Sequence, residues 1–225
     1  MRNRNTIVLR EGRPFIIAAL VLLALLWLVS APCWLLAVWL LLTVFVVAFF
    51  RNPERVIPTG EGLIACPADG EVVAVEELDD QRFGLGRCRR VCIFMSPFNV
   101  HVNRVPVSGR VREVRYRPGR YYVASDAKAS EHNEQCAVVL ETPARQRVVM
   151  VQIAGMLARR IVTYPRPGDE LIRGQRYGLI RFGSRVDLYL PFGSTIDVLR
   201  GDRVFGGSTV IGRMPHDGEN AAAQG

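Results

Sequence analysis

Two copies of the tripeptide Phe-Gly-Ser lie close together in the sequence IRFGSRVDLYLPFGSTIDV, residues 180–198. One copy ends at Ser184 and the other at Ser194, and each adjoins a strand-like run of alternating residues. Glycine and serine are common in turns, so two hairpin turns would explain the pattern without any chemistry. A serine hydroxyl could instead act as a nucleophile, provided that a base lies near it.

The sequence offers one well-placed base and one candidate acid. His216 lies in the terminal tail and His132 in the polar stretch ASEHNEQ, whereas His101 follows an apolar run in FMSPFNVHVNRVPVSG. A histidine at the end of a strand is more often structural, but His101 is the well-placed side chain that titrates near neutral pH. Asp69, in CPADGEVVAV, is the candidate acid, although Asp-Gly is also a common turn.

Several familiar kinds of site are not indicated. Serine, histidine and aspartate could form a hydrolase triad, but the sequence has no G-x-S-x-G motif. The stretch FGLGRCR lacks the lysine of a phosphate-binding loop, and the scattered arginines match no nucleic-acid-binding pattern. The cysteines form no C-x-x-C pair, so no metal site is predicted. They are Cys33, Cys66, Cys88, Cys92 and Cys136.

The near absence of lysine limits amine chemistry. Of the 29 basic residues only Lys128 is a lysine, so it alone could hold pyridoxal phosphate as a Schiff base. A carbonyl could instead come from the chain, at a Gly-Ser bond in a strained turn. The serine hydroxyl would attack the glycine carbonyl to give an ester, and loss of the serine Cα proton would then cut the chain. The dehydroalanine that remains would hydrolyse to an N-terminal pyruvoyl group, given a base and donors for the oxyanion.

Residues 1–55 are predicted to anchor the chain in a membrane. Residues 15–50 are almost purely apolar, and one helix of that length would span about 54 Å, more than the roughly 30 Å hydrocarbon core. An interruption at Ser30, Ala31 and Pro32 predicts two helices, about Phe15–Ala31 and Cys33–Phe50, in a membrane hairpin. A cleaved signal peptide fits poorly, because the apolar region is too long and lacks a cleavage site. The flanking arginines, which predict that both ends are cytoplasmic, are Arg2, Arg4, Arg10, Arg13, Arg51 and Arg55.

Residues 56–225 are predicted to form a mainly β (α+β) domain with a disordered tail from about Pro215. One short helix is expected at Gly155–Ile161, and TPARQR is expected to be a hairpin loop. The net charge of +8 suits a surface that faces anionic lipids. The predicted strands, which follow alternating runs between turn residues, are Glu71–Val75, Val91–Met95, Ala137–Glu141, Val148–Ile153, Leu179–Phe182 and Val186–Leu190.

Several longer motifs together resemble one family. PADG, SPFNVHVNRVPVSG and a late FGS occur in the order found in phosphatidylserine decarboxylases, and FFRNPER, EHNEQ, QIAGMLARRIVTY and RGQRYGLIRFGSRVDLYLP resemble the short bacterial form. The likeness covers nearly the whole chain. It implies a self-processing enzyme of the inner membrane that converts phosphatidylserine to phosphatidylethanolamine and carbon dioxide. The implied cofactor is a covalent pyruvoyl group that forms a Schiff base with the substrate.

The resemblance also assigns the site. RGQRYGLIRFGS matches the glycine-rich approach to the family's processing site, with Arg173, Gly174, Gly178, Phe182, Gly183 and Ser184 in register. Cleavage is therefore expected between Gly183 and Ser184 rather than at Ser194, leaving associated chains of 183 and 42 residues (225 − 183). Arg185 stands where many relatives have threonine. Asp69 and His101 match the family's acidic and histidine motifs, and Arg104 stands at the position of a second histidine in longer members. The resemblance therefore implies either that His101 serves both self-cleavage and decarboxylation or that Asp69 positions a water.

Two other functions remain open from the residues alone. The first is a membrane-anchored, β-rich module that binds anionic lipid, with both Phe-Gly-Ser copies as ordinary turns. The second is a serine hydrolase that uses Ser184 or Ser194. No metal and no nucleic-acid partner are expected, and the chain is compatible with a homo-oligomer.

Overall fold

The computed structural model describes residues 7–120, 122, 129–155, 160–181 and 183–215. The chain divides into two compact units, Met1–Glu54 and Arg55–Gly225. The expected helix at Gly155–Ile161 falls mostly outside the described residues, and its last residue, Ile161, begins a strand instead. The expected tail from Pro215 also lies outside them, apart from Pro215 itself.

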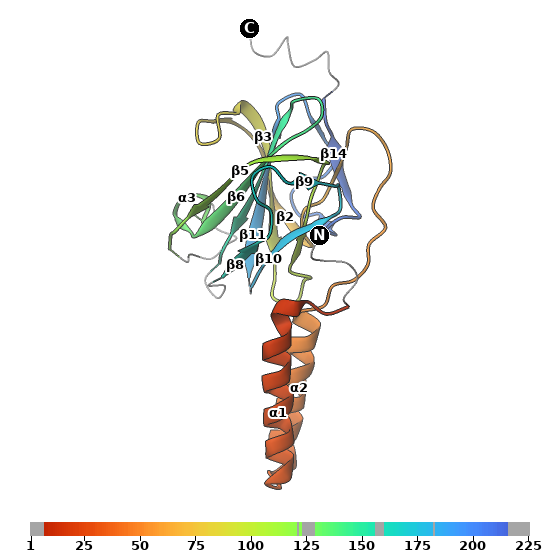
Figure 1. Cartoon of the computed structure of the whole chain (residues 1–225), viewed down its shortest axis with the longest axis vertical. Coiled ribbons are helices and arrows are strands. Elements are labelled where there is room, and N and C mark those ends of the chain that lie inside the picture. Colours follow the sequence, from red (N-terminus) through yellow and green to blue (C-terminus); the bar gives the residue numbers. More distant parts are fainter. Residues whose placement is uncertain (1–6, 121, 123–128, 156–159, 182, 216–225) are drawn as a thin grey trace. The chain divides into compact units, whose positions relative to one another are not determined.

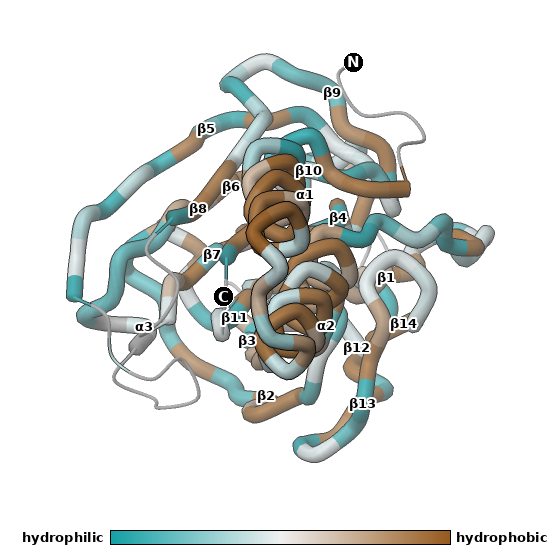
Figure 2. The backbone as a smooth tube through the Cα atoms, turned by 90° about the horizontal axis from the view of Figure 1, so that it is seen from below, coloured by the Kyte–Doolittle hydropathy of each residue, from teal (hydrophilic) through white to brown (hydrophobic). Residues whose placement is uncertain are grey.

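The first unit is a pair of apolar helices. A 3-10 turn at Arg10–Gly12 leads into α1 (Arg13–Leu28), and α2 spans Cys33–Phe49 (Figure 1). Pro32 immediately precedes α2, at a position where its missing N–H removes no hydrogen bond from the helix. The helices are joined by a hydrogen bond from Trp39 Nε1 to the carbonyl of Ala19, 2.8 Å long. Hydrophobic residues make up most of both helices (Figure 2).

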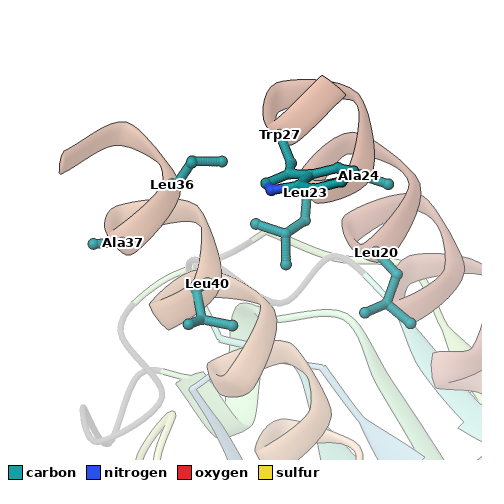
Figure 3. A pocket seen from close by; sticks show the side chains of 7 residues that line it. All are labelled: Leu20, Leu23, Ala24, Trp27, Leu36, Ala37 and Leu40. Atoms are coloured by element: carbon teal, nitrogen blue, oxygen red, sulfur yellow. The ribbon is translucent and has the colours of Figure 1, made fainter. Parts of the chain in front are cut away.

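An apolar groove of about 460 Å³ lies between the two helices, opposite the end where the chain enters and leaves them (Figure 3). By length and composition, the helix over Arg10–Leu28 can cross a membrane, whereas α2 has 17 residues and is shorter. At the other end, the backbone N–H of Leu9 donates to the carbonyl of Phe50 at 2.9 Å. The groove is lined by Leu20, Leu23, Ala24, Trp27, Leu36, Ala37 and Leu40.

The second unit is mainly β, as the sequence predicts. Its elements are β1 (Leu63–Ala65), β2 (Gly70–Asp80), β3 (Gly86–Met95), β4 (Val102–Arg104), β5 (Gly109–Arg117), α3 (Ala129–His132), β6 (Gln135–Glu141), β7 (Arg147–Ile153), β8 (Ile161–Thr163), β9 (Glu170–Leu171), β10 (Arg176–Ile180), β11 (Ser184–Pro191), β12 (Thr195–Ile196), β13 (Arg203–Val204) and β14 (Val210–Arg213).

Eight of these strands form one curled antiparallel sheet in the order β13-β2-β3-β11-β7-β6-β5-β9 (Figures 1 and 2). Two small sheets accompany it, in the orders β1-β14-β12 and β4-β10-β8. Strand β11 lies near the middle of the large sheet, between β3 and β7. All of β11 except Pro191 is buried, so both of its faces are covered.

The alternation of side chains along β11 separates two apolar clusters. Val186, Leu188 and Leu190 belong to the larger cluster, together with Met95 and Tyr177. Tyr189 belongs to a smaller cluster on the other face of the sheet, which includes Cys88, Val149 and Ile153. Because neighbouring residues of a strand point to opposite faces, Ser184 shares its face with Val186, and Arg185 shares its face with Tyr189.

The predicted strands are found where the alternating runs indicated them. Five of the six lie within β2, β3, β6, β7 and β11. The sixth, Leu179–Phe182, corresponds to β10, which ends at Ile180, and Phe182 lies outside the described residues. TPARQR is the hairpin connection between β6 and β7, except that its last residue, Arg147, begins β7; within it Arg145 adopts a positive φ of 57°.

Candidate active site

Ser184 stands where the chain passes from one sheet into another. Strand β10 ends at Ile180 in a small sheet, and β11 begins at Ser184 in the large one. Gly183 has a φ of 57°, in the left-handed region that favours glycine. Ser184 is fully buried, and its Oγ has no hydrogen-bond partner among the described residues. A buried hydroxyl without a partner is uncommon and marks a candidate functional group.

His101 ends a constrained connection between two strands. Met95 ends β3, Val102 begins β4, and between them the side chain of Asn99 accepts hydrogen bonds from the N–H and the hydroxyl of Ser96 at 2.8 and 2.7 Å. His101 is 1 % exposed, and its Nδ1 lies 2.9 Å from the carbonyl oxygen of Asn99. A carbonyl only accepts hydrogen bonds, so Nδ1 carries the proton and Nε2 keeps the lone pair in the neutral ring.

The strand registers bring the connections that carry these two residues to the same place. In the large sheet Ser184 pairs with Met95, and in the small sheet Leu179 pairs with Val102. The segment 96–101 therefore joins the same two sheets, at the same end of their strands, as the segment 181–183. This places His101 at the end of β11 that begins with Ser184.

Ser194 lies at the opposite end of β11. It follows the turn after Pro191, and its backbone N–H donates to the carbonyl of Pro191 at 3.0 Å. The strand from Ser184 to Pro191 has eight residues, so the two ends of β11 lie about 23 Å apart. Ser194 is also buried, with no hydrogen-bond partner for Oγ among the described residues, so burial does not distinguish the two serines. The two serines differ in position, because the connection that carries His101 lies at the end of β11 that begins with Ser184.

Asp69 is held by groups other than His101 and Ser184. Its Oδ2 accepts a hydrogen bond from Arg55 Nη2 at 2.6 Å, and its Oδ1 accepts one from the backbone N–H of Gly206 at 2.8 Å. Within the described part of the chain, neither oxygen is bonded to His101 or to Ser184. Asp69 is 6 % exposed, and burial raises its pKa despite the attraction of Arg55. The structure does not join the three side chains in a hydrogen-bonded triad.

Arg104 is the charged group of β4 that faces Asp69. Its guanidinium donates to the carbonyl of Gly174 at 3.1 Å, and its positive charge acts on Asp69. Burial is the main cause that lowers the pKa of Arg104, and repulsion from the positive charge of Arg55 lowers it further. Asp69 therefore lies in a charged cluster with Arg55 and Arg104. Arg104 is three residues beyond His101 in the sequence. Sequence reasoning assigned Arg55 only to the membrane flank, because pairing over such a separation leaves no local signal.

A buried polar network supports the strands next to Ser184. The Gln152 amide donates to Asn103 Oδ1 at 2.7 Å, and the hydroxyl of Thr163 donates to Gln152 Oε1 at 2.6 Å. Asn103 Nδ2 also contacts the sulfur of Met95, the residue paired with Ser184, at 3.6 Å. The network links β3, β4, β7 and β8. Sequence reasoning missed it, although a glutamine within the apolar run VVMVQI was a possible signal.

Two glycines before Ser184 have identifiable steric roles. A Cβ on Gly178 would lie 2.3 Å from the carbonyl oxygen of Val162 and 2.8 Å from Gln152 Nε2. Gly174 has a φ of 79°, and a Cβ there would lie 2.4 Å from Ile57. The glycine-rich approach to Ser184 therefore lets β10 pass close to β8 and to the polar network. Within the described residues, no group of three or more potential metal ligands is present.

Comparison with known proteins identifies the family of this chain. The family model described as phosphatidylserine decarboxylase matches residues 42–212. A phosphatidylserine decarboxylase proenzyme from Citrifermentans bemidjiense is 49% identical, over 96% of this chain and all of its own length. The proenzyme from Nitratidesulfovibrio vulgaris is 49% identical over 97% of this chain and all of its own length. The proenzyme from Symbiobacterium thermophilum is 50% identical over 94% of this chain and 98% of its own length. The chain belongs to the phosphatidylserine decarboxylase family.

Proposed function

We propose that the chain converts phosphatidylserine to phosphatidylethanolamine and carbon dioxide through a pyruvoyl group that it makes from its own Ser184. Family membership supports a decarboxylase and disfavours both a non-catalytic lipid-binding module and a serine hydrolase. The observation that carries the assignment to Ser184 is a buried hydroxyl without a hydrogen-bond partner, next to a glycine of positive φ, at the same strand end as His101.

The residues present fit the formation of such a group. The Ser184 hydroxyl attacks the Gly183 carbonyl carbon, so the Oγ–C bond forms, the C–N bond breaks and the amine of residue 184 is released. A base then removes the Cα proton of residue 184, and the Gly183 carboxylate leaves, which cuts the chain. The dehydroalanine that remains takes up water and loses ammonia to give the ketone. At Gly183 a Cβ would have no described neighbour within 4 Å, so this position has room for the rearrangement.

His101 is the proposed proton carrier for both stages. The hydrogen bond between Nδ1 and the Asn99 carbonyl fixes the ring, so Nε2 is the atom that accepts a proton during cleavage. A pyruvoyl group at residue 184 would supply a carbonyl that holds the substrate amine and an electron sink for the loss of carbon dioxide. His101 then returns a proton to the carbon that lost the carboxylate. Burial of His101 and Ser184 keeps bulk water from competing for this proton.

The two apolar helices are the proposed membrane anchor. Basic residues at both outer ends, including Arg10, Arg13 and Arg51, favour a hairpin whose ends face the cytoplasm. We place the enzyme at the inner membrane on this basis, with its second unit on the cytoplasmic side. An anchored enzyme can act on a two-chain lipid that stays in its leaflet.

Mass analysis of the full-length protein, purified in detergent, tests the proposal. The wild type is expected as two pieces of 183 and 42 residues, the smaller with a blocked N-terminus that cyanoborohydride traps with phosphatidylserine. Ser184→Ala is expected to remain a single chain of 225 residues, whereas Ser194→Ala is expected to be cleaved. An intact but active wild type would refute the pyruvoyl mechanism. Cleavage lost only in Ser194→Ala would move the site to the other end of β11.

A further inference from the structure

Arg185, the residue after the proposed cleavage site, belongs to a buried ionic cluster. Its Nε lies 2.7 Å from Asp187 Oδ1, and its Nη2 lies 3.1 Å from Asp187 Oδ2, so the guanidinium binds both carboxylate oxygens. The hydroxyl of Ser130 accepts a hydrogen bond from Arg185 Nη2 and donates one to Asp187 Oδ2 at 2.9 Å. Arg185 is 3 % exposed, Asp187 is 0 % exposed and Ser130 is 4 % exposed.

This cluster is on the face of the sheet opposite to Ser184. Residues 185, 187 and 189 of β11 share one face, and residues 184, 186 and 188 share the other. The Arg185 guanidinium therefore has no route to a substrate bound on the Ser184 side of the strand. Its influence on residue 184 passes through the backbone of β11, which makes it a positioning residue and not a catalytic one.

The position of Arg185 matters most after the chain is cut. Residue 184 pairs with Met95 on one side only, whereas Arg185 pairs with both Phe94 and Ile153. Cleavage makes residue 184 a chain end, and chain ends fray unless they are tied down. Fraying of residues 184 and 185 would withdraw the Arg185 guanidinium from Asp187 and from Ser130, which is unfavourable because the Asp187 carboxylate would stay buried without its charge partner.

We propose that Arg185, Asp187 and Ser130 form a clamp that holds the new chain end of the mature enzyme, so that the ketone of residue 184 stays where the substrate amine meets it. This inference rests on the proposed function. α3 supplies Ser130, so the clamp ties the small chain to the large chain within one residue of the reacting carbon. Small displacements of a reacting group lower the rate of the chemical step far more than they change substrate binding.

The test uses full-length variants in detergent, with phosphatidylserine micelles as substrate. In the double variant Arg185→Met/Asp187→Leu both charges are removed, so no unpaired charge is buried. We expect complete cleavage, a kcat lower by on the order of 10-fold to 100-fold, and a KM within about twofold of wild type. Amide exchange of residues 185–188, measured by mass spectrometry on the cleaved enzyme, is expected to accelerate. Arg112→Met, which removes an exposed arginine paired with Glu141, is the matched control.

Each outcome bears on the proposal. A cleaved double variant with wild-type kcat would overturn it, and so would a change in KM alone, because that would indicate substrate contact. If the double variant does not accumulate or is not cleaved, Ser130→Ala is used to test the clamp, because this variant keeps both charges. Faster exchange at residues 185–188 with a severalfold lower kcat would then support the clamp, and wild-type behaviour would refute it. Loss of cleavage in the wild type itself would refute the proposed function instead.

Discussion

Replacing Gln152 by leucine should destabilise the domain through the polar network next to Ser184. Leucine has a similar size but cannot donate to Asn103 Oδ1 or accept from Thr163. Asn103 is fully buried, so its carbonyl oxygen would lose its partner with no water to replace it, at a cost of about 1–3 kcal/mol. Thr163 is only partly buried and would lose about 0.5–1.5 kcal/mol. The expected loss is therefore about 2–4 kcal/mol.

The assay is thermal unfolding followed by circular dichroism, in a Ser184→Ala background so that every sample has the same covalent structure. At about 2–4 °C per kcal/mol for a domain of this size, Tm should fall by about 5–15 °C. Gln81→Leu, at an exposed glutamine that bonds Asp79, is the control and should change the free energy of unfolding by less than about 0.5 kcal/mol.

A second variant tests the cause of the effect. In Gln152→Leu/Asn103→Leu both partners of the buried hydrogen bond are apolar, so no carbonyl is left unpaired. The double variant should lose less stability than the sum of the two single variants, by about 1 kcal/mol or more. A Gln152→Leu protein with an unchanged Tm, or strictly additive single variants, would refute the role given to this network.

Three further predictions concern the site. His101→Ala should slow self-cleavage by on the order of 10²-fold to 10⁴-fold, measured as the uncut fraction over time, and cleavage at the wild-type rate would exclude His101 as the base. Burial raises the pKa of Asp69, so the folded domain holds this proton more tightly than the unfolded chain does. The free energy of unfolding that Asp69 contributes therefore falls as the pH rises from the ordinary pKa of an aspartate to the raised pKa of Asp69. Denaturant titrations at several pH values should show this fall in the wild type and not in Asp69→Asn. Gly178→Ala should lower stability by about 1–3 kcal/mol in the same titrations, because its Cβ would overlap the Val162 carbonyl; an unchanged midpoint would contradict the close approach.

Most of the long strands could be predicted from sequence because their signal is local, but the nine-residue β5, whose register shifts between Val111 and Glu113, was not predicted. An alternating run such as VCIFM carries its own evidence for a strand, and β3 contains it. The short strands β4, β8 and β9 were not predicted, since two or three residues show no period and are strands only because a neighbour pairs with them.

The residues of the candidate site could be proposed from sequence, but their arrangement could not. The alternating run after FGS and the resemblance to a known family indicated Ser184, and the run before SPFNVH indicated His101. Their common location depends on two strand registers, Ser184 with Met95 and Leu179 with Val102, which no local pattern encodes. The association of Asp69 with Arg55 likewise comes from tertiary folding, because the intervening residues carry no sign of it.

If the chain is cut before Ser184 as proposed, the place of β11 in the large sheet determines how the two pieces stay together. The 42 residues that follow the break would keep β11 hydrogen-bonded between β3 and β7, β13 along β2, and β14 along β1. A nick at residue 184 thus removes one covalent bond and leaves these ladders intact, so the fragments should part only when the whole fold melts. Once melted, they would have to find each other again as two molecules, which makes maturation a one-way step for the fold as well as for the peptide bond.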